Sequence, residues 1–279
     1  MNFKLGVMME SFLLPWREAI EVAKKIGADG LQIRTTDGEF KASVMSKALK
    51  QELKDRLNAN GLEISALCGD LCKGFGNKEL NPSLIEESKR IIDLAKELGT
   101  NIVTTHIGFV PGDKNHERYK IMQEACYELA MYADKMEAKF AVETGPETSL
   151  TLKNFLESLG SKGVSVNLDP ANLVMVTGDD PVKAVENLKD YIVHTHAKDG
   201  RKLYDLSPEI IYGLEESEML SSPAFIELPL GDGDIPFENY LKALNGIGFE
   251  GYLTIEREVG ADPKADIIKA ADFLRKYIG

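Results

Sequence analysis

Short hydrophobic runs rich in β-branched residues alternate along the chain with longer stretches in which hydrophobic positions recur at helical spacing. The runs predict eight strands, which begin at Lys4, Gly30, Leu62, Asn101, Lys139, Val164, Tyr191 and Gly251. Helical spacing is clear over residues 84–98 and 267–278. Asn81-Pro82 and Asp180-Pro181 place a capping side chain before a proline, which is typical of a helix start. Alternation of this kind is typical of a parallel sheet covered by helices.

Eight strand–helix units favour a closed barrel. No linker rich in Gly, Ser or Pro separates them, so we expect a single (β/α)8 TIM barrel over residues 1–279. An open doubly wound sheet would show a G-x-G-x-x-G turn after an early strand, and the sequence contains none. Gly251 follows Tyr191 by 60 residues, about twice the roughly 30 residues of one unit. We therefore expect an insertion at about residues 201–230, after strand seven, overhanging the active-site face.

Composition narrows the function classes. The 279 residues include 33 Lys and Arg against 45 Asp and Glu, a formal net charge of -12. A field of this sign repels phosphate backbones, so we expect no nucleic-acid partner. The three cysteines are an odd, sparse set, typical of a reducing compartment. No apolar run reaches the roughly 18–20 residues that span a bilayer. We expect a cytoplasmic protein without a membrane partner.

Polar residues follow the alternation expected for the inside of a barrel. On strand eight, Leu253 faces the helices, which sends Glu256 inward. The same parity turns Glu143, Asp169 and His196 inward on strands five, six and seven. All four stand at or beside the carboxyl end of a strand, where barrel enzymes keep their chemistry. Four neighbouring strands thus bring three carboxylates and an imidazole to one place.

Such a cluster predicts a metal site. Three uncompensated carboxylates repel one another and raise at least one pKa, and a divalent cation removes that repulsion. Oxygen ligands with one nitrogen suit Mn²⁺ or Mg²⁺, with Co²⁺ or Zn²⁺ as alternatives, while the absence of thiolates disfavours a closed structural zinc site. We expect one divalent cation, Mn²⁺ before the others, with two coordination positions open to adjacent oxygens of a sugar.

These motifs resemble those of the xylose isomerase-like TIM barrels, also described as sugar phosphate isomerase/epimerase or apurinic endonuclease family 2 proteins. The resemblance spans essentially the whole chain and rests on Glu143 in VETG, Asp169 in NLDPANL, His196 in HTHAKDG and Glu256 in LTIERE. It implies that these four residues bind the metal, as in D-tagatose 3-epimerase-like members, and that Glu143 and Glu256 exchange protons with the substrate. The implied activity is isomerisation or epimerisation of a ketose, keto-sugar or polyol derivative through a metal-stabilised enediolate.

The match departs from the ketose epimerases at two places. Asn172 stands where they commonly carry a histidine, three residues after the metal aspartate, and HAKDG replaces their HLGE-like stretch. The alternative is a metal-dependent dehydratase or lyase, since relatives similar to inosose dehydratase and dehydroshikimate dehydratase use such a site for β-elimination. Phosphodiester hydrolysis is a remote alternative, because no D-x-H pair occurs and the net charge is wrong for DNA. A non-catalytic sugar-binding barrel is disfavoured by the intact four-ligand set.

Further residues are expected to contact a small carbohydrate substrate. They are His106, Asn172, Lys198, Arg34, Glu10 and Trp16. Three of these six candidates also have a structural interpretation. His106 could be a core histidine, and Trp16 could pack at a helix start. Lys198 could pair with Asp199 instead of donating to an oxyanion or phosphate. His194, one inward position deeper than His196, is expected to be structural. The oligomeric state stays open, with a homo-oligomer among the alternatives.

Overall fold

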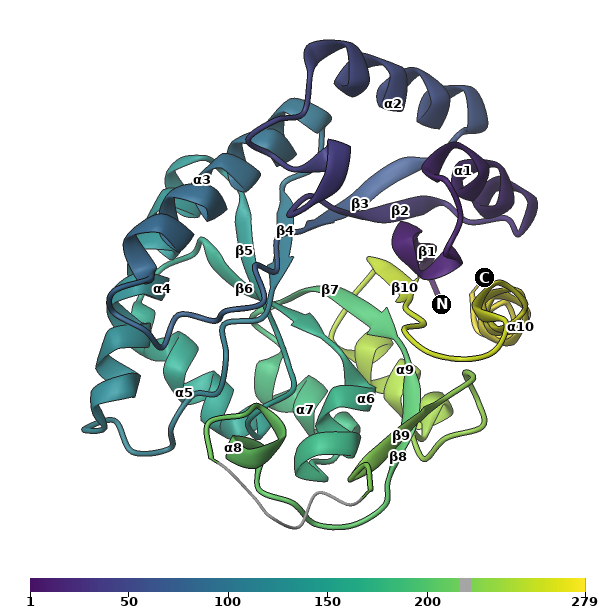
Figure 1. Ribbon diagram of the computed structural model, residues 1–279. Helices are drawn as coiled ribbons and strands as arrows, with labels where there is room; N and C mark the ends of the chain where they lie inside the picture. Colours follow the sequence, from purple (N-terminus) through teal and green to yellow (C-terminus); the bar gives the residue numbers. More distant parts are fainter. Residues whose placement is uncertain (216–221, 279) are drawn as a thin grey trace.

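A computed structural model describes residues 1–215 and 222–278 and shows a closed barrel of eight parallel strands (Figure 1). The barrel strands are β1 (Lys4–Met8), β2 (Gly30–Arg34), β3 (Glu63–Cys68), β4 (Ile102–Thr105), β5 (Lys139–Glu143), β6 (Val164–Leu168), β7 (Ile192–Ala197) and β10 (Tyr252–Ile255). They follow one another in chain order around the barrel, and pairing of β1 with β10 closes it. This confirms the predicted (β/α)8 barrel and all eight predicted strands.

One long helix follows each barrel strand and covers the outside of the barrel. These helices are α1 (Trp16–Lys25), α2 (Lys47–Asn60), α3 (Asn81–Leu98), α4 (Glu117–Lys135), α5 (Ser149–Leu159), α7 (Pro181–Leu188), α9 (Phe237–Gly246) and α10 (Pro263–Leu274). Each turns an apolar stripe toward the strands, as Ile91 and Ile92 of α3 show by being fully buried. Among the helices described, none combines the length and the apolar character that crossing a bilayer requires.

The two expected helix caps have different outcomes. Asp180 caps α7, because its side chain accepts hydrogen bonds from the backbone N–H of Val182 and Lys183. The prediction for Asn81 was wrong, since Asn81 lies inside the first turn of α3. Its amide donates instead to the carbonyl of Phe75 at 3.0 Å and ties the preceding loop to the helix.

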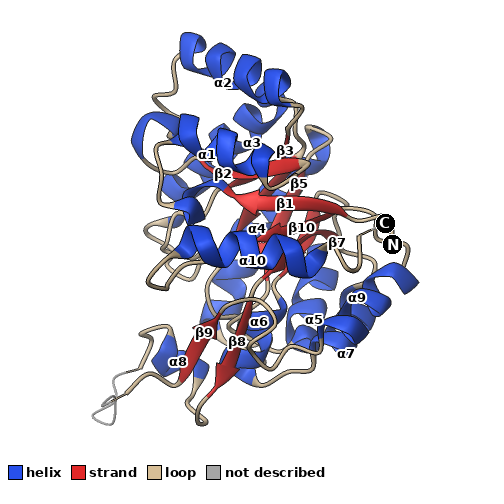
Figure 2. Cartoon of the chain, turned by 90° about the vertical axis from the view of Figure 1, so that its right-hand side faces the viewer, coloured by secondary structure: helices blue, strands red, loops and turns tan. Residues whose placement is uncertain are grey.

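The chain between β7 and α9 leaves the barrel. It forms an antiparallel pair, β8 (Asp199–Lys202) with β9 (Phe225–Leu228), and a short helix, α8 (Pro208–Ile211). Figure 2 shows these elements projecting from one end of the barrel. Residues 216–221 of the expected insertion lie outside the described residues.

A second short segment supports the β8–β9 pair. After β6 the chain forms α6 (Pro170–Asn172) and then a π-helical turn, Leu173–Thr177, against which β8 and β9 pack. The approach is close: a Cβ atom at Gly200 would lie 2.3 Å from Met175 Sδ and 2.8 Å from the backbone oxygen of Ile226, and the backbone atom cannot move aside as the methionine can, which favours glycine there. Asp199 anchors the far end by accepting from the backbone N–H of Gly231 and Gly233. The two glycines therefore form a turn held by a carboxylate.

The interior of the barrel holds a buried polar network. Gln32 Nε2 donates to Thr104 Oγ1 at 2.9 Å, and His194 Nδ1 donates to Asn167 Oδ1 at 2.8 Å. Thr254 Oγ1 donates to the other nitrogen of His194 at 3.0 Å. All five side chains are fully buried. These hydrogen bonds join neighbouring strands inside the barrel, below the residues at the carboxyl ends of the strands. His194 belongs to this network and is structural, as expected.

Candidate metal and substrate site

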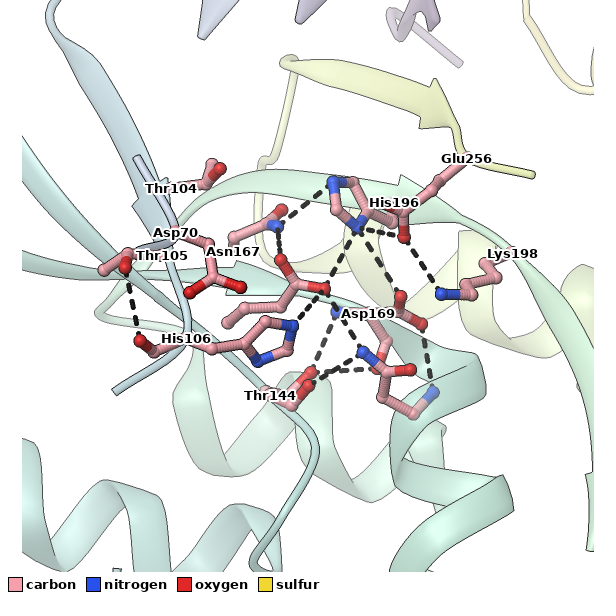
Figure 3. Close-up of polar contacts among 12 residues, drawn as sticks. Asp70, Thr104, Thr105, His106, Thr144, Asn167, Asp169, His196, Lys198 and Glu256 are labelled. Carbon is pink, nitrogen blue, oxygen red and sulfur yellow. Dashed lines mark hydrogen bonds and ion pairs between the residues drawn. The ribbon is translucent and has the colours of Figure 1, made fainter. Parts of the chain in front are cut away.

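Four predicted residues meet at the carboxyl end of the barrel. His196 Nδ1 lies 3.3 Å from Glu143 Oε1, 3.5 Å from Asp169 Oδ2 and 3.2 Å from Glu256 Oε2. One ligand atom from each of the four lies within 4.8 Å of the other three. Figure 3 shows Asp169, His196 and Glu256 pointing toward one another from three neighbouring strand ends. Strand parity therefore located the cluster correctly.

Hydrogen bonding fixes the proton of His196. Its Nε2 lies 2.9 Å from Gln32 Oε1, and the Gln32 amide nitrogen is occupied as a donor to Thr104. Gln32 Oε1 can only accept, and its shorter contact favours the tautomer with the proton on Nε2 over the one in which Asn167 Nδ2, 3.2 Å away, donates to that nitrogen. The lone pair of Nδ1 then faces the three carboxylates. A histidine that donates one ring N–H to a fixed acceptor is the usual arrangement for a metal ligand.

Asp169 is held by one oxygen and leaves the other free. Its Oδ1 accepts from the backbone N–H of Ala171 at 2.8 Å and of Asn172 at 3.1 Å, which caps α6. Thr144 Oγ1 donates to the Asp169 carbonyl at 2.8 Å and accepts from its N–H at 2.9 Å. These four bonds fix the carboxylate so that Oδ2 points at His196.

The residues present fit a divalent cation. Asp169 Oδ2 and His196 Nδ1 are both buried and have no hydrogen-bond partner. Buried polar atoms are almost always paired, so two orphaned acceptors 3.5 Å apart indicate that a cation belongs between them. Three carboxylates and one imidazole are the donor set of a Mn²⁺ or Mg²⁺ site, and Zn²⁺ and Co²⁺ also accept it.

Charges at the site are strongly coupled. Burial raises the pKa of Glu256, but His196 and Lys198 lower it by more than burial raises it, so that the resulting pKa is about 2. Burial likewise raises the pKa of Glu143, yet His106 and His196 hold it well below its usual range. Burial lowers the pKa of His106, and Glu143 more than offsets this and raises it to about 9. Burial also lowers the pKa of His196, but the same carboxylates raise it by more, so that without a metal ion protonated His196 and His106, together with Lys198, hold both glutamates as carboxylates; a bound cation would take the place of the His196 proton on Nδ1.

A cavity of about 460 Å³ opens above the cluster. His106, Asn172 and Lys198 line it together with Glu143 and Glu256. His106 Nε2 lies 3.4 Å from Glu143 Oε1, and Asn172 Nδ2 donates to the same oxygen at 3.2 Å. Three of the six predicted substrate contacts therefore border the cavity.

Lys198 does not pair with Asp199. The ammonium is 4% exposed and lies 3.1 Å from Glu256 Oε2, 3.9 Å from Glu227 Oε2 and in close contact with Glu258. The Asp199 carboxylate is occupied by backbone N–H groups, those of Gly231 and Gly233 among them. The Asp199 alternative was therefore wrong, and Lys198 belongs to the carboxylate cluster.

The other three predicted contacts lie apart from the cavity lining. Trp16 begins α1, packs edge-on against Phe40 and donates its indole N–H to Glu39 Oε1 at 2.9 Å. Glu10 accepts from the backbone N–H of Arg34 at 3.1 Å. The Arg34 side chain is exposed at the end of β2. No structural feature places these three against a substrate in the described residues.

Sequence reasoning missed several lining residues. Glu258 follows Glu256 by two positions, so the parity that found Glu256 could also have found it. Glu227 on β9 and Tyr212 after α8 also line the cavity. They come from the segment between β7 and α9, where the sequence has no periodic hydrophobic pattern that predicts which side chains face the cavity.

Comparison with known proteins agrees with this geometry. A family model described as xylose isomerase-like TIM barrel matches residues 20–277. An inosose dehydratase of Geobacillus thermodenitrificans is 28% identical over 142 residues, which cover 49% of this chain and 45% of that protein. A putative L-ribulose-5-phosphate 3-epimerase of Escherichia coli is 23% identical over 285 residues, 96% of this chain and 94% of that one.

A solved structure shares the whole fold. The xylose isomerase domain protein from Planctomyces limnophilus superposes with a TM-score of 0.79 at 24% identity, over 99% of this chain and 96% of that one. The family model spans nearly the entire barrel, including the carboxyl ends of β5, β6, β7 and β10. The chain belongs to the xylose isomerase-like TIM barrel family.

Proposed function

We propose that the protein is a divalent-metal-dependent isomerase or epimerase that acts on a ketose, keto-sugar or polyol derivative. The observation that carries the proposal is the placement of Glu143 and Glu256, 3.3 Å and 3.2 Å from the same nitrogen of His196. The two glutamates come from β5 and β10, on either side of β6 and β7 in the barrel. Both carboxylates also line the cavity above the cluster, so a substrate bound there would lie within reach of each of them.

This arrangement suits proton transfer beside a carbonyl. A bound cation, Mn²⁺ in our proposal, would supply Lewis-acid stabilisation of negative charge on adjacent substrate oxygens. One glutamate, as a carboxylate, would remove the proton from the carbon next to the carbonyl. The other would return a proton from the opposite face after taking it from solvent, so that the two side chains exchange protonation states in each turnover. Asn172 Nδ2 and His106 hold Glu143 Oε1 in place, and Lys198 holds Glu256 Oε2. General acid–base assistance of this kind contributes about 10²- to 10⁴-fold in rate.

Elimination of water is the second candidate. The similarity to inosose dehydratases favours it, and an enolate formed by one glutamate can expel a neighbouring hydroxyl instead of being reprotonated. Loss of hydroxide needs a proton donor on the same side as the leaving group. His106 supplies one, since its Nε2 lines the cavity 3.4 Å from Glu143.

Deuterium incorporation separates the two reactions. The protein supplied with Mn²⁺ is incubated in D₂O with a panel of ketoses and cyclic keto-polyols, and the products are read by mass spectrometry and proton NMR. Epimerisation or isomerisation introduces one deuterium beside the carbonyl and retains all oxygens, whereas dehydration gives a product lighter by one water. Absence of both reactions across the panel would contradict the proposal.

Matched variants test the residue roles. Glu143→Gln and Glu256→Gln keep the shape of each side chain but remove the base, so each should reduce exchange by at least about 10²-fold. Glu157→Gln, an exposed position on α5, is the control and should exchange like the parent protein. Unchanged turnover in both test variants would refute the assignment of the two glutamates.

A further inference from the structure

The cavity above the cluster has walls of two kinds. Most charged side chains come from the ends of the barrel strands, with Glu227 on β9 as an exception, and most apolar ones come from the segments after β6 and β7, with Val259 after β10 as an exception. The apolar lining residues are Met175, Val176, Ile211, Tyr212, Phe225, Ile226 and Val259. They make up seven of the fourteen residues that line the cavity. A substrate that fills the cavity would therefore touch carboxylates at one end and hydrocarbon at the other.

Three of these apolar side chains, Tyr212, Ile226 and Val259, keep much of their surface exposed, whereas Met175 and Val176 are buried. Ile226 is 44% exposed and Val259 is 51% exposed, although both line a cavity that has a charged floor. Exposed apolar side chains gathered at one site, with polar residues around them, mark a surface that a ligand covers. A cavity of about 460 Å³ also lies within the roughly 300–1,000 Å³ that takes ligands of drug size. The site has room for a group beyond the reacting carbons.

The charges in the cavity disfavour a phosphorylated substrate. Lys198 is the one Lys or Arg among the lining residues in the described parts of the chain, and Glu227, Glu256 and Glu258 already surround its ammonium. The nearby guanidinium of Arg257 is engaged by Glu227 at 2.6 Å and by Asp266 at 2.8 Å. The imidazole of His106, which also lines the cavity, is engaged by Glu143 at 3.4 Å, so a phosphate would have to displace a carboxylate to gain any of these cationic partners.

Backbone donors do not replace the missing cation. The N–H groups of Ala171 and Asn172, at the start of α6, are taken by Asp169 Oδ1. The residues of the 216–221 segment, Glu-Ser-Glu-Met-Leu-Ser, include no lysine or arginine. A phosphate ester would therefore meet four carboxylates, those of Glu143, Glu227, Glu256 and Glu258.

We infer that the substrate is uncharged and carries an apolar group beyond the carbons that react. A neutral sugar or keto-sugar with an aryl or alkyl substituent, such as an aryl glycoside, has this chemistry. The sugar oxygens lie toward the cluster and the substituent packs on Ile226, Val259 and Tyr212. The orientation of the sugar end rests on the proposed function, whereas the preference for an apolar and uncharged outer part rests on the cavity walls.

Binding calorimetry on the Mn²⁺-supplied protein tests this inference with three ligands that share one sugar. The probes are D-glucose, D-glucose 6-phosphate and phenyl β-D-glucopyranoside. The phenyl glycoside should bind at least about tenfold more tightly than glucose, because it buries apolar surface that water otherwise contacts. The phosphate ester should bind no more tightly than glucose. If the phosphate ester binds most tightly, or the phenyl glycoside gains nothing over glucose, the inference is overturned.

Two variants locate the effect. Ile226→Ser and Val259→Ser should each reduce the phenyl preference at least threefold, while Leu203→Ser, an exposed apolar position of the same segment outside the cavity lining, should retain it. Melting curves identify a variant that fails to fold. If one of the two test variants fails, the phenyl preference of the other one tests the inference. An unchanged phenyl preference in the folded variants overturns the inference.

The deuterium experiment is a separate test. If the protein exchanges deuterium into ketoses but prefers phosphate esters, the inference fails and the proposed function stands. If the phenyl preference depends on Ile226 or Val259 but neither exchange nor dehydration occurs, the inference stands and the proposed function fails. The two experiments therefore report independently on the outer and inner parts of the site.

Discussion

The two halves of the barrel are built alike but differ in what their polar residues do. Glu143, Asp169, His196 and Glu256 lie at or directly after the carboxyl ends of β5, β6, β7 and β10, and their ligand atoms face one another. From β1 to β4 and the loops after them, one residue, His106, lines the cavity in the described parts of the chain. The same strand–helix repeat therefore supports chemistry on one side and mainly structure on the other.

Paired and unpaired polar atoms occur in both halves, and it is their arrangement that distinguishes the halves. In the first half, Gln32 and Trp16 place their polar atoms on protein partners, Thr104, His196 and Glu39. In the second half, Asp169 Oδ2 and His196 Nδ1 are buried without partners. Unpaired buried atoms are costly, and they persist where a ligand supplies the missing interaction. The first half also has unpaired buried atoms, such as Glu10 Oε2 and Ser65 Oγ, so the mark of the site is that two unpaired acceptors lie 3.5 Å apart beside two further carboxylates.

The largest expected effect comes from removing one cluster carboxylate. In Asp169→Asn, the amide oxygen can still cap α6, but the other atom becomes an N–H that donates to His196 Nδ1 in place of a cation. Turnover should fall by at least about 10³-fold, since a metal contributes several kcal/mol of charge stabilisation. Mn²⁺ at about 100 times its Kd should stabilise the parent protein by about 2.7 kcal/mol and leave the variant unchanged.

Asp180→Asn is the matched control for that variant. Asp180 also caps a helix, α7, but it lies outside the cluster, so the Mn²⁺-induced rise in Tm should persist. Thermal melts of the three proteins with and without Mn²⁺ make the measurement. An equal rise in all three would show that the second half of the barrel does not hold the cation.

A smaller effect tests how far the first half contributes. Gln32 of β2 accepts the Nε2 proton of His196 and so directs Nδ1 toward the carboxylates. In Gln32→Leu this acceptor is lost, and Mn²⁺ affinity should fall about 10- to 100-fold, as is usual for partners of ligand histidines. Gln51→Leu on α2 is the control, because Gln51 bonds only to the exposed Asp55. Metal titration by calorimetry measures both, and equal affinities would confine metal binding to the second half.

Stability should depend on pH through Glu147, after β5. Burial raises the pKa of this carboxyl from about 4.5 to about 8; one oxygen accepts from the N–H of Val110 and the other has no partner. Between these values the folded protein keeps a proton that the unfolded chain releases. The contribution of Glu147 to the free energy of unfolding is therefore fully present below pH 4.5 and is lost as pH rises through 8. The free energy of unfolding falls by at most about 1.4 kcal/mol per pH unit over this range.

Urea unfolding at pH 5, 7 and 9 measures this dependence. Glu147→Gln stays neutral at every pH, so its stability should fall less between pH 5 and pH 9 than that of the parent protein. Glu157→Gln, at an exposed position of α5, should follow the parent curve. Parallel curves for parent and Glu147→Gln would show that Glu147 is not the group responsible.

The sequence was sufficient for the fold and the four-residue cluster because both follow from periodicity. Alternation along β10 sends Glu256 inward, and the carboxyl ends of parallel strands converge whatever the loops do. Arg34 shows where this reasoning stops. It follows the inward parity of Gln32, yet its side chain is exposed at the end of β2. Parity gives the face of a strand but not whether a long side chain on its last residue stays inside the barrel or turns out to solvent.

The cavity walls were beyond sequence reasoning for a different reason. Tyr212 and Ile226 reach the cavity because β8 and β9 pair and pack on the π-helical turn after β6. Contacts between segments that are far apart in the chain depend on loop conformations, which no hydrophobic period encodes. The orphaned nitrogen of His196 was equally hidden, since it follows from the partner that Gln32 provides across the barrel.

Trp16→Phe has the smallest expected effect and tests the comparison most directly. The ring still packs against Phe40, but the indole N–H bond to Glu39 is lost, so stability should fall by about 1 kcal/mol. Because Trp16 is not among the cavity-lining residues, kcat/KM should stay within about twofold of the parent value. Urea unfolding and steady-state kinetics on the substrate found by deuterium exchange measure the two effects. A tenfold rise in KM with unchanged stability would place Trp16 against the substrate, and the first half of the barrel would then share in recognition as well as in support.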